Sequence, residues 1–341
     1  MQRTELNEIG EFALIEKIKQ SSTLRNPESI QGIGDDAAVM DYGGSQYTLL
    51  STDMLVEGIH FDLSYCPLKH IGYKAVSVNV SDIVAMNGVA KQITVSIGVS
   101  NRFSVEAIEE LYKGIHFACK NYNIDLVGGD TTSSHKGLII SISVMGLVDK
   151  DKVAYRQGAK DKEIICVTGD LGGAYLGLQV LEREKQVFLA NPDMQPELSG
   201  KDYILQRQLS PDARSNFIAE FAQLDLVPTS MIDISDGLAS DLMHLCQSSG
   251  VGAMLFEEKL PIEALSYEQA IEFNLSPTTC ALNGGEDYEL LFTVKQEDFP
   301  KIEQHPHISH IGYVQDKSLG VSLTTRAEQV VPIEAQGFKH F

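Results

Sequence analysis

Basic residues, paired cysteines and long apolar runs are all scarce in this sequence of 341 residues. Its 27 lysine and arginine residues against 47 aspartate and glutamate residues give a net charge of −20. This charge argues against a general nucleic-acid binder, since such proteins need a basic surface to displace counterions from phosphates. The first twenty residues are too rich in charge for a secretion signal, and the longest apolar stretch, Gly137 to Val148, is too short for a membrane span. We therefore expect a cytoplasmic protein that acts on neither nucleic acid nor membrane.

The cysteines are few and lie far apart, and no two of them form a C-x-x-C pair. The five are Cys66, Cys119, Cys166, Cys246 and Cys280. An odd, scattered set argues against a disulfide framework. It suits a reducing compartment, where such residues are usually small buried apolar groups.

The length of the chain predicts two domains of roughly 150–190 residues each. The stretch from Asp149 to Lys162 is charged and has no long apolar run, so we expect the boundary there, with domains at 1–150 and 151–341. Periodicity predicts helices over 9–18, 70–86, 104–121, 172–183, 213–224, 237–248 and 262–273. It predicts strands over 37–41, 47–51, 93–99, 124–127, 138–148, 163–168, 230–234, 251–256 and 288–294, with a polar loop over 186–200. Without a clean βαβ alternation, this mixture favours an α+β fold in both domains.

Four segments place aspartates beside glycines or at the ends of apolar runs. They are Gly32-Ile33-Gly34-Asp35-Asp36, Ser51-Thr52-Asp53, Gly128-Gly129-Asp130-Thr131-Thr132 and Asp233-Ile234-Ser235-Asp236-Gly237. Each segment alone reads more readily as a turn, because glycine and aspartate are common turn residues. Asp236 could equally cap the helix that follows it.

Asp82 is harder to explain as a surface residue. In the helix predicted over 70–86, Ile71, Ala75 and Val78 form one apolar stripe, and Asp82 falls on that stripe at the next i+4 step. Burying an unpaired carboxylate costs several kcal/mol, so the group needs a cation, strong donors or a proton. A backbone or arginine partner inside the core is one explanation for a buried Asp82, and a bound metal ion is the more specific one.

The strand period also predicts that Asp233 and Ser235 point the same way at a strand's end. Magnesium takes carboxylate oxygens and fills its other positions with water and phosphate oxygens, while glycines let backbone N–H groups approach phosphates. The segments together therefore favour Mg²⁺–nucleotide chemistry.

Common nucleotide and cation motifs are absent or incomplete. The sequence has no G-x-x-x-x-G-K-[ST] loop and no protein-kinase motifs. Residues 32–37 match G-x-G-x-x-A, but no apolar strand precedes them, and two aspartates would repel a bare pyrophosphate. Residues 233–237 begin like an EF-hand loop, but Leu238 stands at the glycine position and His244 at the closing glutamate position.

Taken in order, these segments resemble thiamine-monophosphate kinases, within the superfamily that includes aminoimidazole ribonucleotide synthetase. Further matches are Gly58-Ile59-His60-Phe61, Val78-Asn79-Val80-Ser81-Asp82, Tyr155-Arg156-Gln157-Gly158-Ala159 and Gly284-Gly285-Glu286-Asp287-Tyr288-Glu289. The resemblance runs from Gly10 to Phe338 and so covers essentially the whole chain. It implies two α/β domains of the aminoimidazole ribonucleotide synthetase type, with the N-terminal domains pairing in a homodimer. It also implies direct transfer of the γ-phosphoryl group of ATP to thiamine monophosphate, with Mg²⁺ ions bound.

The resemblance assigns roles to matching positions. It implies metal ligation by Asp36, Thr52, Asp53, Asp82, Asp130 and Asp233, with Ser51 and Asp236 as further candidates. It implies nucleotide contacts from Gly129, Asp130, Arg156, Ser235 and Tyr112, and substrate contacts from His60, Glu286 and Phe338. Of these, Asp53, Asp82, Asp130 and Arg156 would be catalytic. Tyr112 could instead be a half-buried helix aromatic and His60 an ordinary strand-end histidine, and Phe338 stands where the family often has tyrosine, so any hydroxyl hydrogen bond is lost.

Two other classes of function stay open. Sister enzymes of the superfamily share the acidic ATP site, although residues 54–61 look like those of the thiamine kinases. No cysteine precedes Cys66 and none lies near the end of the chain, which argues against the selenium-handling and hydrogenase-maturation members. The chain could also be a non-catalytic nucleotide-binding module, but acids stand in every motif, which argues against decay of a former enzyme.

Overall fold

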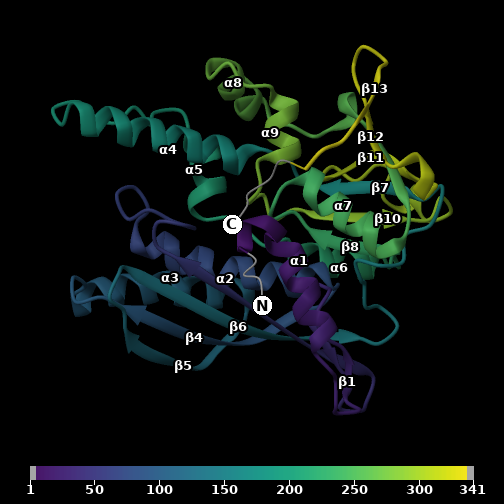
Figure 1. Ribbon diagram of the computed structural model, residues 1–341, viewed down its shortest axis with the longest axis horizontal. Helices are drawn as coiled ribbons and strands as arrows, with labels where there is room; N and C mark the ends of the chain where they lie inside the picture. Colours follow the sequence, from purple (N-terminus) through teal and green to yellow (C-terminus); the bar gives the residue numbers. More distant parts are fainter. Residues whose placement is uncertain (1–4, 336–341) are drawn as a thin grey trace.

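The computed structural model describes residues 5–335, which form two mixed β-sheets with helices around them (Figure 1). The first sheet has six strands in the order β1-β2-β3-β6-β4-β5, and only β4 and β5 run parallel. Its strands are β1 (Ser29–Gln31), β2 (Ala38–Met40), β3 (Gln46–Val56), β4 (Val89–Val99), β5 (Asp125–Ser133) and β6 (Leu138–Asp149). All six lie before residue 150, where the sequence predicts the end of the first domain.

The second sheet has seven strands in the order β13-β12-β9-β11-β7-β10-β8, with β9 and β12 parallel. Its strands are β7 (Ile164–Thr168), β8 (Ser230–Asp233), β9 (Gly252–Phe256), β10 (Leu290–Val294), β11 (Ile308–Gln315), β12 (Val321–Thr324) and β13 (Val330–Pro332). Two mixed sheets with helices packed beside them confirm the predicted α+β class.

Nine α-helices lie within the described residues (Figure 1). They are α1 (Leu6–Ser21), α2 (Leu68–Ala85), α3 (Val105–Tyr122), α4 (Gly173–Ala190), α5 (Asp202–Leu209), α6 (Asn216–Gln223), α7 (Leu238–Ser249), α8 (Ala264–Glu272) and α9 (Pro277–Asn283). Among the described residues, no helix is both long and apolar enough to cross a lipid bilayer.

Helix α2 lies at the centre of the molecule, between the first sheet and the second half of the chain (Figure 1). Nearly all of its residues from Ile71 to Ala85 are buried, because its apolar side chains face β3 and β6 on one side and the second half on the other. Its buried polar side chains therefore need partners. Ser77 bonds the Tyr122 hydroxyl at 2.9 Å, and Asn79 donates to a carbonyl one turn earlier at 2.9 Å. The helix thus carries polar side chains into the interior, where one bonds a distant tyrosine and the other bonds the helix's own backbone.

Two sequence predictions are corrected by the structure, and two helices were missed. Residues 128–132 form part of strand β5 and not a turn, because they pair with β4 along its whole length. Helix α4 continues to Ala190, so the predicted loop over 186–200 is reduced to its last ten residues. Helices α5 and α9 were not predicted, although α9 has a clear start, in which Ser276 accepts from the Thr279 N–H and Pro277 follows.

Candidate active site

Four aspartates from distant parts of the chain form an acidic cluster around α2. Asp36 comes from the loop between β1 and β2, Asp53 from β3, Asp82 from α2 and Asp233 from the end of β8. One carboxylate oxygen each of Asp36, Asp82 and Asp233 lies within 4.8 Å of the others. The cluster therefore joins the two halves of the chain, and Asp82 lies on a helix whose neighbouring residues are buried, as the helix-face argument predicts.

Asp53, Asp82 and Asp233 hold their protons more tightly than free aspartates do. Burial, and then repulsion from Asp36, raises the pKa of Asp53 to about 6 and that of Asp233 to about 7. Burial raises the pKa of Asp82 well above its usual range, with further contributions from its three acidic neighbours. Like charges this close favour either protons or a cation.

The hydrogen bonds of the cluster leave one acceptor oxygen for a cation. Ser51 donates to Asp82 at 2.5 Å and Ser81 donates to Asp233 at 2.6 Å. One buried oxygen of Asp36, Oδ2, has no hydrogen-bond partner among the described residues. Convergent carboxylate oxygens, one of them without a donor, are the ligand set that magnesium prefers. The residues therefore fit the predicted metal ion.

Arg156 is the cation of the cluster. Its guanidinium donates to Asp36 Oδ1 through Nη2 at 2.6 Å and through Nε at 3.2 Å. Its backbone N–H donates to Asp35, whose pKa is raised to about 6 by burial and by repulsion from Asp36. Asp35 was quoted in the motif but was not predicted as a site residue. Arg156 thus neutralises one acid and leaves the cluster negative.

The segment after β8 differs from its predicted form. The strand ends at Asp233, so strand alternation does not govern Ser235, whose carbonyl instead accepts from the Glu286 N–H at 2.7 Å. Asp236 is not the N-cap of α7, because that position is held by Gly237. The Asp236 N–H donates to the buried carboxylate of Asp241 at 3.2 Å. Asp236 therefore lies beside the cluster, in a loop whose backbone is held by the Asp241 side chain of α7.

Two predicted residues, Thr52 and Asp130, lie on the opposite side of the first sheet, which we call the outer face, and Gly129 precedes Asp130 on the same strand. The Thr52 hydroxyl donates to the Ile142 carbonyl at 2.9 Å, on the side of β3 away from Asp53. Asp130 is exposed on β5, opposite Ser96 of β4, and does not join the acidic cluster of its own chain. A Cβ atom on Gly129 would lie 1.8 Å from the Val95 carbonyl oxygen, so the close pairing of β4 and β5 requires glycine.

The residues predicted to face the acceptor substrate come from two loops. His60 follows β3, and its Nδ1 accepts from the Val56 N–H at 3.0 Å, so in the neutral ring the proton lies on Nε2. Glu286 lies in the segment between α9 and β10, where Lys74 and Gln208 contact its carboxylate at 2.7 and 2.8 Å. Tyr112 is half-buried on helix α3, and its ring centroid lies 6.1 Å from that of His116. This position matches the alternative reading of Tyr112 as a half-buried helix aromatic. Phe338 lies outside the described residues.

Two buried charged residues beside the site were not predicted: Asp241 and Lys74. Burial, with repulsion from Asp236 and Asp233, raises the pKa of Asp241 well above its usual range. Both residues lie among buried helix residues, Asp241 next to Leu238 and Leu242, and Lys74 between Ile71 and Val78. The helix-face argument that identified Asp82 would have found both.

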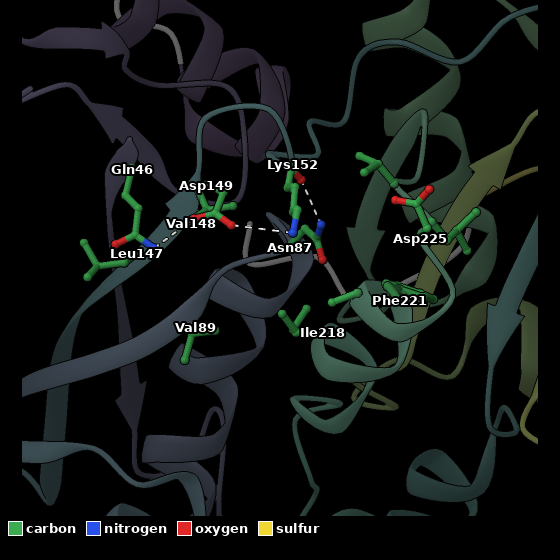
Figure 2. A pocket seen from close by; sticks show the side chains of 13 residues that line it. Gln46, Asn87, Val89, Leu147, Val148, Asp149, Lys152, Ile218, Phe221 and Asp225 are labelled. Carbon is green, nitrogen blue, oxygen red and sulfur yellow. Dashed lines mark hydrogen bonds and ion pairs between the residues drawn. The ribbon is translucent and has the colours of Figure 1, made fainter. Parts of the chain in front are cut away.

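The described residues also enclose two cavities away from the cluster. One, of about 140 Å³, lies between the end of the first sheet and α6, where Asn87 donates to the Lys152 carbonyl at 2.8 Å (Figure 2). The other, of about 390 Å³, is lined by polar side chains of α5 and the following loop, among them Arg207 and Arg214. Both arginines pair with the buried carboxylate of Glu289. No predicted site residue lines either cavity.

Comparisons with known proteins find relatives along essentially the whole chain. Residues 34–148 match the family described as AIR synthase related protein, N-terminal domain. The chain is 33% identical over 338 residues to the thiamine-monophosphate kinase of Bacillus subtilis (strain 168), covering 98% of this chain and 100% of the relative. It is 36% identical over 339 residues to that of Aquifex aeolicus (strain VF5), covering 98% and 99%. A solved structure of AaThiL complexed with AMPPCP and TMP superimposes with a TM-score of 0.84 at 33% identity, covering 100% of both chains.

Proposed function

The chain belongs to the family of thiamine-monophosphate kinases, and we propose that it transfers the γ-phosphoryl group of ATP directly to thiamine monophosphate, forming thiamine diphosphate. The observation that carries this proposal is the acidic cluster, in which Asp36, Asp82 and Asp233 converge within 4.8 Å. Phosphoryl transfer needs little covalent help from a protein, because positioning and charge neutralisation supply most of the catalysis. A cluster of carboxylates with few donors of its own is suited to that task once cations are bound.

Magnesium ions held by the acidic cluster would neutralise the charge of the phosphates during transfer. Arg156, held in place by Asp36, adds a positive charge that needs no reorganisation when the nucleotide binds. His60 would offer its Nε2–H to the acceptor phosphate, and Glu286 would accept from the organic part of that substrate. No general base is required, because the attacking phosphate oxygen is already anionic near neutral pH. We place this reaction in the cytoplasm, in keeping with five buried cysteines that are all unpaired.

We also infer that two copies of the chain pair through the outer face of the first sheet. This face carries Leu50, Met54 and Met145, which are 44%, 56% and 38% exposed. Exposed apolar side chains of this size on one sheet face favour burial against a partner. Asp130 lies on the same face, so this pairing would place it at the interface between the two copies. Light scattering of the purified protein tests the pairing, and a monomer at micromolar concentration would contradict it.

The activity is tested by incubating purified protein with ATP, Mg²⁺ and thiamine monophosphate, and separating the products by chromatography. Equal amounts of ADP and thiamine diphosphate, both abolished by a chelator, are the expected result. ADP without thiamine diphosphate would retain the ATP site and assign another acceptor, as in a sister enzyme. Bound ATP with neither product would favour the non-catalytic binding module.

A further inference from the structure

Lys74 is a buried lysine that the proposed chemistry does not use. It lies on α2 and is only 4% exposed, although lysine is almost never fully buried unless it is paired. Its Nζ lies 2.7 Å from Glu286 Oε1 and 3.5 Å from the Gln208 carbonyl oxygen. Lys74 therefore forms an ion pair with Glu286, a residue from the other half of the chain.

The backbone holds Glu286 just as firmly. Glu286 has φ +58°, a left-handed conformation that is costly for any residue but glycine unless its surroundings impose it. Two backbone bonds impose it here: the Glu286 N–H donates to the Ser235 carbonyl at 2.7 Å, and the Tyr288 N–H donates to the Ile234 carbonyl at 2.8 Å. Glu286 is thus tied to the loop that follows Asp233. Non-glycine residues kept in this conformation cluster at functional sites.

The two side-chain contacts also define what Glu286 can bind. Lys74 donates to Oε1 and Gln208 Nε2 donates to Oε2 at 2.8 Å, so the carboxylate is fixed in orientation. An ionised carboxylate only accepts hydrogen bonds, and its two oxygens offer about four acceptor positions, of which these contacts use two. The Glu286 side chain is still 29% exposed, so its remaining acceptor positions are accessible from solvent.

Resting on the function proposed above, we propose that Lys74 is a positioning residue for the acceptor substrate. It acts through Glu286, which it holds as an oriented acceptor for the cationic, hydrogen-bond-donating organic part of thiamine monophosphate. Lys74 and Ser81 lie seven residues apart on one face of α2, and Ser81 bonds Asp233 of the acidic cluster. One helix face thus positions both the metal-binding acid and the substrate-binding acid.

A purely structural role, in which Lys74 only joins the two halves of the chain, makes different predictions. Tyr122→Phe provides the matched control, because it removes a hydroxyl that accepts from the Ala213 N–H across the same interface at 3.0 Å without contacting Glu286. Lys74→Met keeps the length of the side chain and removes its charge. Glu286 is partly exposed and can turn to water, so this variant is expected to fold.

The experiment measures the dissociation constant for thiamine monophosphate by calorimetry, and the KM values for both substrates, in five proteins. These are the wild type, Lys74→Met, Glu286→Gln, the double variant and Tyr122→Phe. Lys74→Met is expected to weaken binding of thiamine monophosphate at least tenfold while the KM for ATP changes less than twofold. In the Glu286→Gln background, Lys74→Met should cause no further loss, whereas Tyr122→Phe should leave the binding of thiamine monophosphate within twofold of wild type.

Three results would overturn the inference. The first is unchanged binding of thiamine monophosphate in Lys74→Met. The others are a double variant that binds it more weakly than Glu286→Gln alone, and a loss of affinity in Tyr122→Phe as large as that in Lys74→Met. A wild-type protein that binds thiamine monophosphate but does not phosphorylate it would contradict the proposed function alone, because the variants could still be compared by calorimetry. A wild type that does not bind it would overturn both.

Discussion

Replacing Asp233 by asparagine should stabilise the metal-free protein at alkaline pH, because the carboxylate is buried among other acids. Its pKa in the folded protein is about 7, against 3.8 for an ordinary aspartate. The folded state therefore keeps a proton that the unfolded chain has lost, and this contribution to stability is fully present below about pH 4 and disappears as the pH rises through about 7. At about 1.4 kcal/mol per pH unit, deprotonation between about pH 5 and about pH 8 costs the wild type about 3 kcal/mol. Asparagine has no proton to lose and can still accept the hydrogen bond from Ser81.

Urea denaturation of both proteins in a chelating buffer measures this difference directly. The two should be about equally stable near pH 5, and Asp233→Asn should be the more stable by up to about 3 kcal/mol near pH 8. Comparing the two proteins at each pH cancels groups that titrate in both, such as His244, whose pKa burial lowers to about 4. Excess Mg²⁺ should reverse the order at pH 8, because a ligand that binds only the folded wild type stabilises it by mass action. A pH-independent difference, or a less stable variant at pH 8 without metal, would refute the reasoning.

Other substitutions test the remaining parts of the site and fold. Asp53→Ala and Asp82→Ala should each lower kcat by about three orders of magnitude with an unchanged circular dichroism spectrum. Near-normal turnover in either variant would contradict the assignment of these residues as metal ligands. Glu289→Gln leaves the buried Arg207 and the half-buried Arg214 without their shared acid and should cost about 3–5 kcal/mol in a urea titration, whereas a loss under about 1 kcal/mol would contradict that pairing. Gly129→Ala should lower the melting temperature by several degrees, because its Cβ meets a strand carbonyl, and an unchanged melting temperature would count against this packing. Mixing and refolding inactive Asp82→Ala and Asp130→Ala proteins should restore about a quarter of wild-type activity if Asp130 serves the other copy, and none if it serves its own chain.

Local periodicity predicted the parts of the site that a single helix determines. The spacing of Ile71, Ala75 and Val78 fixed the buried face of α2, and the cost of burying a carboxylate then marked Asp82 as a residue that needs a partner. That Asp36 and Asp233 supply the rest of the cluster followed only from the resemblance to a family. Nearly two hundred residues separate them, and only the tertiary fold brings them together.

Other features escaped prediction for physical reasons. The glycines and aspartate of residues 128–130 are unfavourable in strands, and only long-range pairing with β4 makes this segment a strand. Helices α5 and α9 have eight and seven residues, too few for a helical period to be distinguished from chance. The strand predicted over 47–51 stopped short of Asp53, so the alternation that points Thr52 to the outer face was not applied. Lys74 and Asp241 could have been predicted by the helix-face argument already used for Asp82.

The most direct test of the account follows the γ-phosphate of ATP in a single turnover. Purified enzyme in excess over radiolabelled ATP would be mixed with thiamine monophosphate, with and without Mg²⁺, and stopped at short times. Direct transfer predicts that the label passes from ATP to thiamine diphosphate only when Mg²⁺ is present, without appearing on the protein. Label released as inorganic phosphate, held on the protein, or transferred equally well without a divalent cation would contradict direct transfer at the acidic cluster.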